Sequence, residues 1–234
     1  MSCAKSTFSK YAKALGYQKP KKPKIPIKKG VRANRIFEWL HVDITLVPTL
    51  EDGMQKVAFV KDNFSKAILH YASVSEKADS KFITKLFEEA FLKFNLNEVK
   101  EPINILTDGG SENKGTFSTW VNHFNAPPVV SKITARTNDF PSSNSMAEST
   151  HSIYKTEFLR GKISQHKKQH LDSLDAFVDY YNHHRFPNDL FGLTPFEVIN
   201  GKTPDKDFFK NQIIEAKLDR VTTNRVFNKC AFVG

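Results

Sequence analysis

Short apolar runs alternate with amphipathic segments through the middle of the chain. Three β-rich runs come first, separated by turn residues, at 36–47, 56–60 and 67–74. Further elements follow in turn: a helix over 79–94, a strand over 103–107, a helix over 116–124, a strand over 128–135, helices over 144–159 and 171–184, a short helix over 194–199 and a last helix over 205–218. The leading runs predict an antiparallel meander, and the later alternation predicts further strands covered by helices.

This order of elements predicts an α/β fold with a mixed five-stranded sheet flanked by helices. The order is compatible with the ribonuclease-H-like arrangement, although order alone fits other α/β folds. No apolar run approaches the roughly 20 residues that a membrane span needs, and no signal-peptide pattern opens the chain. The two cysteines, Cys3 and Cys230, lie near opposite ends, which excludes a disulfide framework and a cysteine-rich zinc module. We therefore expect a reducing compartment and no membrane partner.

The first 35 residues differ from the rest of the chain in charge. They contain eleven Lys and Arg and no acid, whereas the remainder holds 24 Lys and Arg against 25 acids. A short helix is predicted over 7–17 and an extended Lys-Pro linker over 19–30. Two interpretations fit this basic arm. It binds nucleic-acid phosphates, with Lys21, Lys22 and Lys24 as DNA contacts, or it is a solvated leader that aids solubility or nuclear import.

Three carboxylates stand out by their context. Asp43 interrupts an apolar strand, where aspartate is depleted. Asp108 ends another apolar strand and precedes Gly109 and Gly110, which permit a tight exit turn. Glu148 lies in the first turns of a helix that follows a polar loop. Taken singly, the three have ordinary interpretations: an acid at a strand edge, a turn residue, and an acid that favours a helix N-terminus.

Together the three acids fit one specific chemistry. Phosphodiester cleavage by two metals needs hard oxygen ligands from different elements, and Mg²⁺ prefers carboxylates, phosphate oxygens and water. A shared metal site would also offset the cost of like charges held close together. We therefore expect Asp43, Asp108 and Glu148 to be the catalytic residues and to bind Mg²⁺, with Mn²⁺ as an alternative.

Four segments, in order, resemble a known family: WLHVDIT, ILTDGGSEN, SMAESTHSIYKTEFL and YYNHHRFPNDLFGLTPFEVING. They resemble the integrase-type catalytic core of DDE transposases, with the closest likeness to the IS3-like insertion-sequence families, which share a core with retroviral integrases. By this resemblance Asp43 matches the first acid of the family, Asp108 the second and Glu148 the third. The run from Tyr181 to Pro195 is similar to the family's closing motif.

The resemblance implies a ribonuclease-H-like catalytic core over 36–202, preceded by a basic arm or linker over 1–35 and followed by a helical extension over 203–234. It also implies a metal-dependent protein that cuts and joins DNA. The chain departs from the family pattern at Ser143-Asn144, where many relatives carry Asp-Asn. No full helix-turn-helix precedes the core, and the helix over 7–17 would be its remnant.

Several residues near Glu148 are candidate DNA contacts. Lys155 lies seven positions after Glu148, about two helical turns along the same face, and His151 lies about one turn along it. The other candidates are basic: Arg160, Lys162, Lys167, Lys168 and Arg185. Each also has an ordinary interpretation, as a solvent-facing side chain or, for Arg185, as a charge that caps a helix C-terminus.

We expect a Mg²⁺-dependent transposase that hydrolyses a phosphodiester at the end of an element and joins the freed 3′-hydroxyl to target DNA. Its partners would be transposon-end DNA, target DNA and, because two ends must be joined, further copies of the chain. One alternative is a DNA-binding remnant without end recognition or transposition activity. Another is a ribonuclease-H-type nuclease, which leaves the Tyr181–Pro195 motif unexplained. In a bacterial host the protein would be cytoplasmic and associated with the nucleoid.

Overall fold

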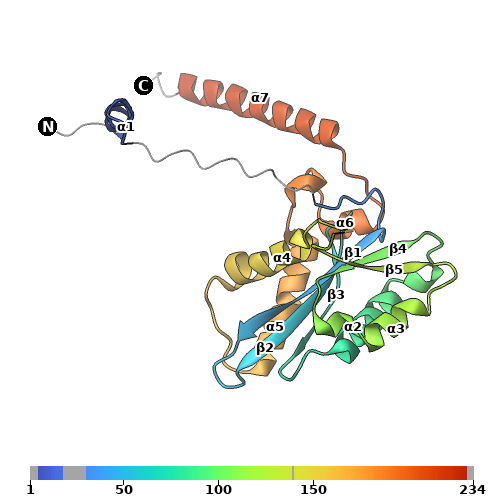
Figure 1. Ribbon diagram of the computed structural model, residues 1–234. Helices are drawn as coiled ribbons and strands as arrows, with labels where there is room; N and C mark the ends of the chain where they lie inside the picture. Colours follow the sequence, from blue (N-terminus) through green and yellow to red (C-terminus); the bar gives the residue numbers. More distant parts are fainter. Residues whose placement is uncertain (1–4, 18–29, 139, 231–234) are drawn as a thin grey trace.

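A five-stranded mixed sheet with helices on both faces forms the centre of the computed structural model (Figure 1), which describes residues 5–17, 30–138 and 140–230. The strands are β1 (Trp39–Pro48), β2 (Met54–Asp62), β3 (Ile68–Val74), β4 (Ile103–Thr107) and β5 (Val130–Thr134), in the spatial order β3-β2-β1-β4-β5. β1, β2 and β3 form the expected antiparallel meander, while β4 and β5 run parallel to β1. The expected mixed sheet is therefore confirmed.

One face of the sheet is covered by α2 (Ser80–Lys93) and α3 (Thr116–Asn122). The side chain of Asp79 caps α2 by accepting the N–H groups of Lys81 and Phe82 at 3.0 Å each. The apolar stripe of α2 packs on alternate strand residues such as Leu40 and Val42, which form the larger core.

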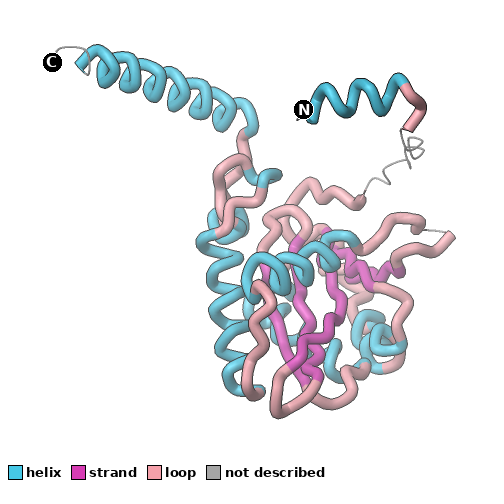
Figure 2. Tube along the Cα trace, turned by 90° about the vertical axis from the view of Figure 1, so that its left-hand side faces the viewer, coloured by secondary structure: helices cyan, strands magenta, loops and turns pink. Residues whose placement is uncertain are grey.

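The opposite face carries α4 (Ser145–Ser152) and α5 (Lys167–Asp179), and Figure 2 shows the strands enclosed between helices. Here the intervening strand residues, among them Val47 and Phe59, pack against Tyr154 and Phe177 in a second core. Because successive side chains of a strand point to opposite faces, the odd-numbered residues of β1 face α4 and α5. This alternation directs Asp43 toward α4.

Helices on the α4 and α5 face differ from their expected extents. The helix expected over 144–159 is α-helical only in α4 and continues as a π-helical segment, η3 (Ile153–Leu159). The helix expected over 171–184 begins earlier, because the side chain of His166 caps α5, and it too ends in a π-helical segment, η4 (Tyr180–His184). The expected helical spacing from Glu148 to Lys155 therefore does not hold, since Lys155 lies in the wider turns of η3.

Local backbone geometry explains two further differences. β1 starts at Trp39 instead of residue 36, because Phe37 has a left-handed φ of 61° that ends an extended segment. α7 (Lys206–Cys230) runs past the expected end at residue 218, and no Gly or Pro lies between residues 219 and 230 to stop it.

The remaining elements include α1 (Lys5–Ala14), α6 (Pro195–Ile199) and three 3₁₀ turns, η1 (Leu96–Glu98), η2 (Ser111–Asn113) and η5 (Asn188–Leu190). Of the expected basic arm, Lys21, Lys22 and Lys24 lie outside the described residues. Within the described part of the chain, no helix combines the length and the apolar character that crossing a bilayer requires.

Candidate active site

Asp43 lies in the middle of β1 on the face covered by α4. Its side chain is about a quarter exposed, and its Oδ1 accepts the backbone N–H of Ile44 at 2.8 Å. In the β1–β2 ladder Asp43 stands opposite Phe59, which packs in the second core. A carboxylate therefore interrupts an otherwise apolar surface.

Asp108 follows β4 directly, at the end of the strand next to β1. The parallel register pairs His41 with Leu106, so Asp43 and Asp108 each lie two residues further along neighbouring strands. Oδ1 of Asp108 accepts the N–H of Gly110 at 3.0 Å and the side-chain amide of Asn113 at 2.6 Å. These bonds hold the carboxylate at the sheet edge, as the strand-exit turn predicted.

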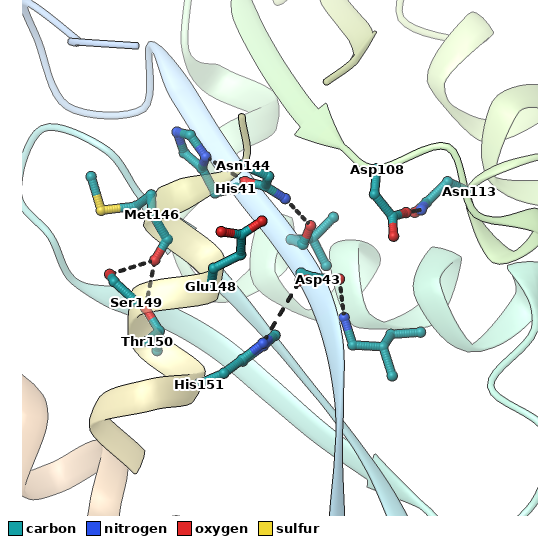
Figure 3. A network of polar contacts seen from close by, with 12 residues as sticks. His41, Asp43, Asp108, Asn113, Asn144, Met146, Glu148, Ser149, Thr150 and His151 are labelled. Atoms are coloured by element: carbon teal, nitrogen blue, oxygen red, sulfur yellow. Dashed lines mark hydrogen bonds and ion pairs between the residues drawn. The ribbon is translucent and has the colours of Figure 1, made fainter. Parts of the chain in front are cut away.

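Glu148 reaches the same place from the first turn of α4, and Figure 3 shows Asp43 between Glu148 and Asp108. Asn144, the N-cap of α4, fixes this helix to β1. Its Oδ1 accepts from Nδ1 of His41 at 2.8 Å, and its Nδ2 donates to the Val42 carbonyl at 2.8 Å. The start of α4 is therefore tied to the residues that flank Asp43.

His41, which donates to Asn144, is a buried and neutral side chain. Burial lowers its pKa to about 4, although the bond to Asn144 opposes the shift. Nε2 of His41 lies 2.8 Å from Nδ2 of Asn63, and an amide nitrogen can only donate, so the proton is assigned to Nδ1.

Burial and neighbouring charges both act on Asp43. The pKa of Asp43 rises to about 6, chiefly because the side chain is desolvated, while the bond from the Ile44 N–H opposes the shift. The negative charges of Asp108, Glu148 and Glu112 raise it further. Negative charges gathered in this way favour the binding of a cation.

The donor set fits a hard divalent cation in its chemistry: three carboxylates from three elements, one of them with a raised pKa. In the present arrangement two of them are engaged elsewhere, Glu148 in an ion pair with Arg136 at 2.5 Å and Asp108 with Asn113. Among the residues that the structure describes, no group of three or more His, Cys, Asp or Glu is arranged to hold a metal ion. A cation held by these acids would compete with Arg136 for the carboxylate of Glu148.

His151 is buried, whereas a direct DNA contact would need it at the surface. Its ring packs against Phe59, and its Nδ1 lies 3.7 Å from Oδ2 of Asp43. Burial lowers its pKa to about 4, and the charge of Lys155 lowers it further. The side chain is therefore a neutral neighbour of Asp43, facing inward.

The remaining candidate DNA contacts divide by exposure. The exposed ones are Lys155, Arg160, Lys162, Lys167 and Lys168. Arg185 is only partly exposed and lies over the ring of Tyr181, 5.5 Å from its centroid. Its guanidinium contacts Glu157 at 3.2 and 3.3 Å, which favours the structural interpretation of Arg185.

Four residues of the site lay beyond the sequence analysis: Glu112, Asn113, Arg136 and Asn144. Asn144 had a usable signal, since asparagine directly before a helix is a preferred N-cap. Glu112 and Asn113 belong to the segment ILTDGGSEN that contains Asp108, whereas Arg136 had no signal, because a loop brings it to Glu148 only in the folded chain.

Comparisons with known proteins agree with this geometry. Residues 148–200 match the sequence family described as the integrase core domain. The match begins at Glu148 and ends just after α6, so it covers less than half of the chain. No curated protein sequence matches this chain significantly.

Solved structures share the fold at low sequence identity. A chain of the simian T-cell lymphotropic virus intasome, solved in complex with PP2A regulatory subunit B56 gamma, aligns with a TM-score of 0.61 and 14% identity, covering 86% of this chain and 72% of that one. The HTLV-2 integrase catalytic core domain, a dimeric form in complex with magnesium, aligns at 0.50 and 15%, covering 71% and 99%.

The catalytic domain of the Mos1 mariner transposase aligns at 0.47 with 9% identity, covering 61% of this chain and 70% of that one. The fold assignment rests on the two viral structures. The chain has the ribonuclease-H-like fold of integrase catalytic cores, and its residues 148–200 are similar to the integrase core domain family.

Proposed function

We propose that this protein is a metal-dependent DNA transposase of the DDE type, similar to the IS3-like families, with Asp43, Asp108 and Glu148 as its catalytic acids. One observation carries the proposal: three acids from β1, the end of β4 and α4 approach so closely that Asp108 and Glu148 both raise the pKa of Asp43. The integrase fold and the match over 148–200 support the same chemistry.

The three carboxylates would hold Mg²⁺, or Mn²⁺ in its place. When bound, the metal would activate the attacking oxygen and stabilise the leaving oxygen of a phosphodiester. Asp43 must be ionised to bind it, and a positive charge nearby lowers the pKa of a carboxyl group. Glu148 would contribute its carboxylate to the metal site, and the Arg136 guanidinium beside it could then pair with a DNA phosphate.

Other side chains of the chain position these acids. Asn144 and His41 hold the start of α4 against β1, so Glu148 stays beside Asp43. His151, neutral and largely buried, occupies the space behind Asp43 and limits access of water from that side. Such preorganisation is the main protein contribution in reactions that need positioning and charge stabilisation.

DNA is the proposed substrate, and further copies of the chain are proposed partners because two DNA ends must be joined. The exposed cations Lys155, Arg160, Lys162, Lys167 and Lys168 would position the DNA by its phosphates. The HTLV-2 integrase core, a dimeric form solved with magnesium, supports both a divalent metal and a multimer.

A cleavage and joining assay tests the proposal. The substrate is a plasmid that carries the DNA flanking both ends of the gene, incubated with Mg²⁺ or Mn²⁺. We expect nicking and strand transfer by the wild-type chain, and a loss of at least about a hundredfold in Asp43→Asn, Asp108→Asn and Glu148→Gln, because each removes a charge that only the metal-bound reaction uses.

Glu101→Gln is the matched control, since Glu101 is an exposed acid before the other end of β4. It should cleave like the wild type, and all variants should bind DNA. Wild-type binding without nicking under either metal would favour the remnant alternative. Full activity in Asp108→Asn would refute the assignment of the acids.

A further inference from the structure

A cleft of about 470 Å³ lies beside α4, between β2 and the turn at 186–189. This volume is in the range of ligand-binding pockets. Lys61 and Tyr181 contribute to its wall, and Ser145 and Met146 begin α4 at its rim. Lys61 stands opposite His41 in the β1–β2 ladder, and the next pair on the same face is Asp43 with Phe59. The cleft and the three acids therefore share one face of the sheet.

Lys61 is a buried cation without a carboxylate partner among the described residues. Its side chain is 2% exposed, and Nζ donates to Thr150 Oγ1 at 2.9 Å and to Tyr181 Oη at 2.5 Å. Both partners are neutral hydroxyls. A buried ammonium without a counter-ion is costly, and this cost appears as a pKa lowered to about 7, chiefly by burial.

Two more cations line the same cleft, each with an acid near it. Arg185 lies over the ring of Tyr181 together with Lys61, and it is paired with Glu157. Lys66 donates to the Asn63 carbonyl at 2.6 Å, and the negative charges of Asp189 and Asp62 favour its charged form. Asp62 offsets part of the charge of Lys61, but the hydrogen bonds of its ammonium go to hydroxyls and not to an acid.

The start of α4 adds hydrogen-bond donors. Ser145 and Met146 are the first residues of an α-helix whose N-cap makes no side-chain capping bond. The first N–H groups of a helix have no partner inside the helix and favour an anion. Three cations, one acid and these donors give the cleft the character of an anion site.

We propose that this cleft binds a phosphate group, with the Lys61 ammonium as its charge partner. A compact anion that reaches Nζ of Lys61 would place a negative charge directly against this buried ammonium. Phosphate could come from a DNA strand that also passes over the acids, an assignment that rests on the proposed function, or from a free phosphate compound. Phosphate binding in this cleft does not require that the protein cleaves DNA.

Calorimetric titration of the full chain with inorganic phosphate, at constant ionic strength and without divalent metal, tests the proposal. We expect one phosphate bound per chain and an affinity at least about tenfold weaker in Lys61→Met, which keeps the length of the side chain but not its charge. Lys66→Met should weaken binding several-fold, and it carries the test if Lys61→Met does not fold. Lys81→Met, an exposed lysine on α2, should bind like the wild type.

A wild-type chain that binds no phosphate, or equal affinity in Lys61→Met, would overturn the proposal. A second arm adds a short DNA oligonucleotide. Displacement of phosphate by DNA, with weaker DNA binding in Lys61→Met, identifies a backbone phosphate, whereas simultaneous binding identifies a free one. If the chain binds phosphate but never cuts DNA, the proposed function is refuted and the proposed phosphate site is not.

Discussion

The fold disfavours the ionised form of Asp43. Glu148 has the guanidinium of Arg136 and Asp108 has the amide of Asn113, whereas Asp43 accepts the N–H of Ile44 and lies 3.7 Å from the neutral ring of His151. It is also the most enclosed of the three acids and the one whose pKa is raised. At the scale of single residues, the folded protein therefore holds a charge that it would hold more easily with a cation present.

Replacing this charge should stabilise the metal-free protein. The folded-state pKa of Asp43, about 6, exceeds its usual value of 3.8, so ionisation costs stability as the pH rises through about 6. Asp43→Asn keeps an oxygen that can accept from Ile44 without that charge. We expect Asp43→Asn to raise the free energy of unfolding by about 1–3 kcal/mol at pH 8 and the gain to vanish below about pH 4.

Urea unfolding at several pH values, without divalent metal, measures this difference. Asp172→Asn, an exposed acid on α5, is the control and should show no such pH dependence. A gain that is absent at pH 8, or that grows as the pH falls, would contradict the raised pKa of Asp43.

At the scale of elements, the join between β1 and α4 decides where the third acid lies. β1 pairs with β4 over Trp39–His41. Just beyond this ladder, the side-chain amide of Asn144 donates a hydrogen bond to the Val42 carbonyl. The same amide accepts from His41, which is in turn tied to Asn63. These buried hydrogen bonds link β1 and Asn63, which directly follows β2, to the start of α4.

Asn144→Ala should loosen this join. It leaves the His41 N–H and the Val42 carbonyl without partners, and each buried unpaired group costs about 1–3 kcal/mol. We expect lower stability by about that amount and slower DNA cleavage, with the loss in kcat because the acids are misplaced while DNA binding is kept. Steady-state cleavage kinetics and urea unfolding are the measurements.

Two variants separate positioning from general destabilisation. Asn144→Asp can still accept from His41 but cannot donate to Val42, so it should recover part of the activity. Asn122→Ala, an exposed asparagine at the end of α3, should leave kcat unchanged. Equal kcat in Asn144→Ala and the wild type would show that the join does not position Glu148.

At the scale of the whole molecule, charge is distributed unevenly. Residues 36–234 are nearly neutral, whereas the first 35 residues hold eleven cations and no acid. Residues 31–35 are part of the core structure, since Ala33 donates to Asn63 and Arg35 to the Pro102 carbonyl. The arm that can be removed without disturbing the core therefore ends before residue 30.

Removal of residues 2–29 should weaken DNA binding and reduce its dependence on salt. Each lost phosphate contact lowers the slope of log affinity against log salt concentration by up to about 0.9. Fluorescence anisotropy with a labelled duplex, over a series of salt concentrations, measures the slope. A chain with Lys21, Lys22 and Lys24 changed to Gln should show a smaller change in the same direction, and an unchanged slope would exclude the arm from the interface.

The sequence by itself determined the sheet and the meander and singled out the three candidate acids, because local signals mark each of them. Alternation of apolar residues marked β1 and β2, and Asp43 was conspicuous because a charge is rare inside such a run. The glycines after Asp108 marked the turn that leaves it at the sheet edge. The bounds of β4 were predicted to the residue.

Only the tertiary structure decided what surrounds the acids. The π-helical turn after α4, the burial of His151, the pairing of Arg136 with Glu148 and the position of Lys61 all arise from segments far apart in sequence. A side chain's exposure, pKa and partners depend on how helices pack on the sheet. Periodicity along the chain specifies which face a residue occupies, whereas the neighbours it meets there are fixed by packing.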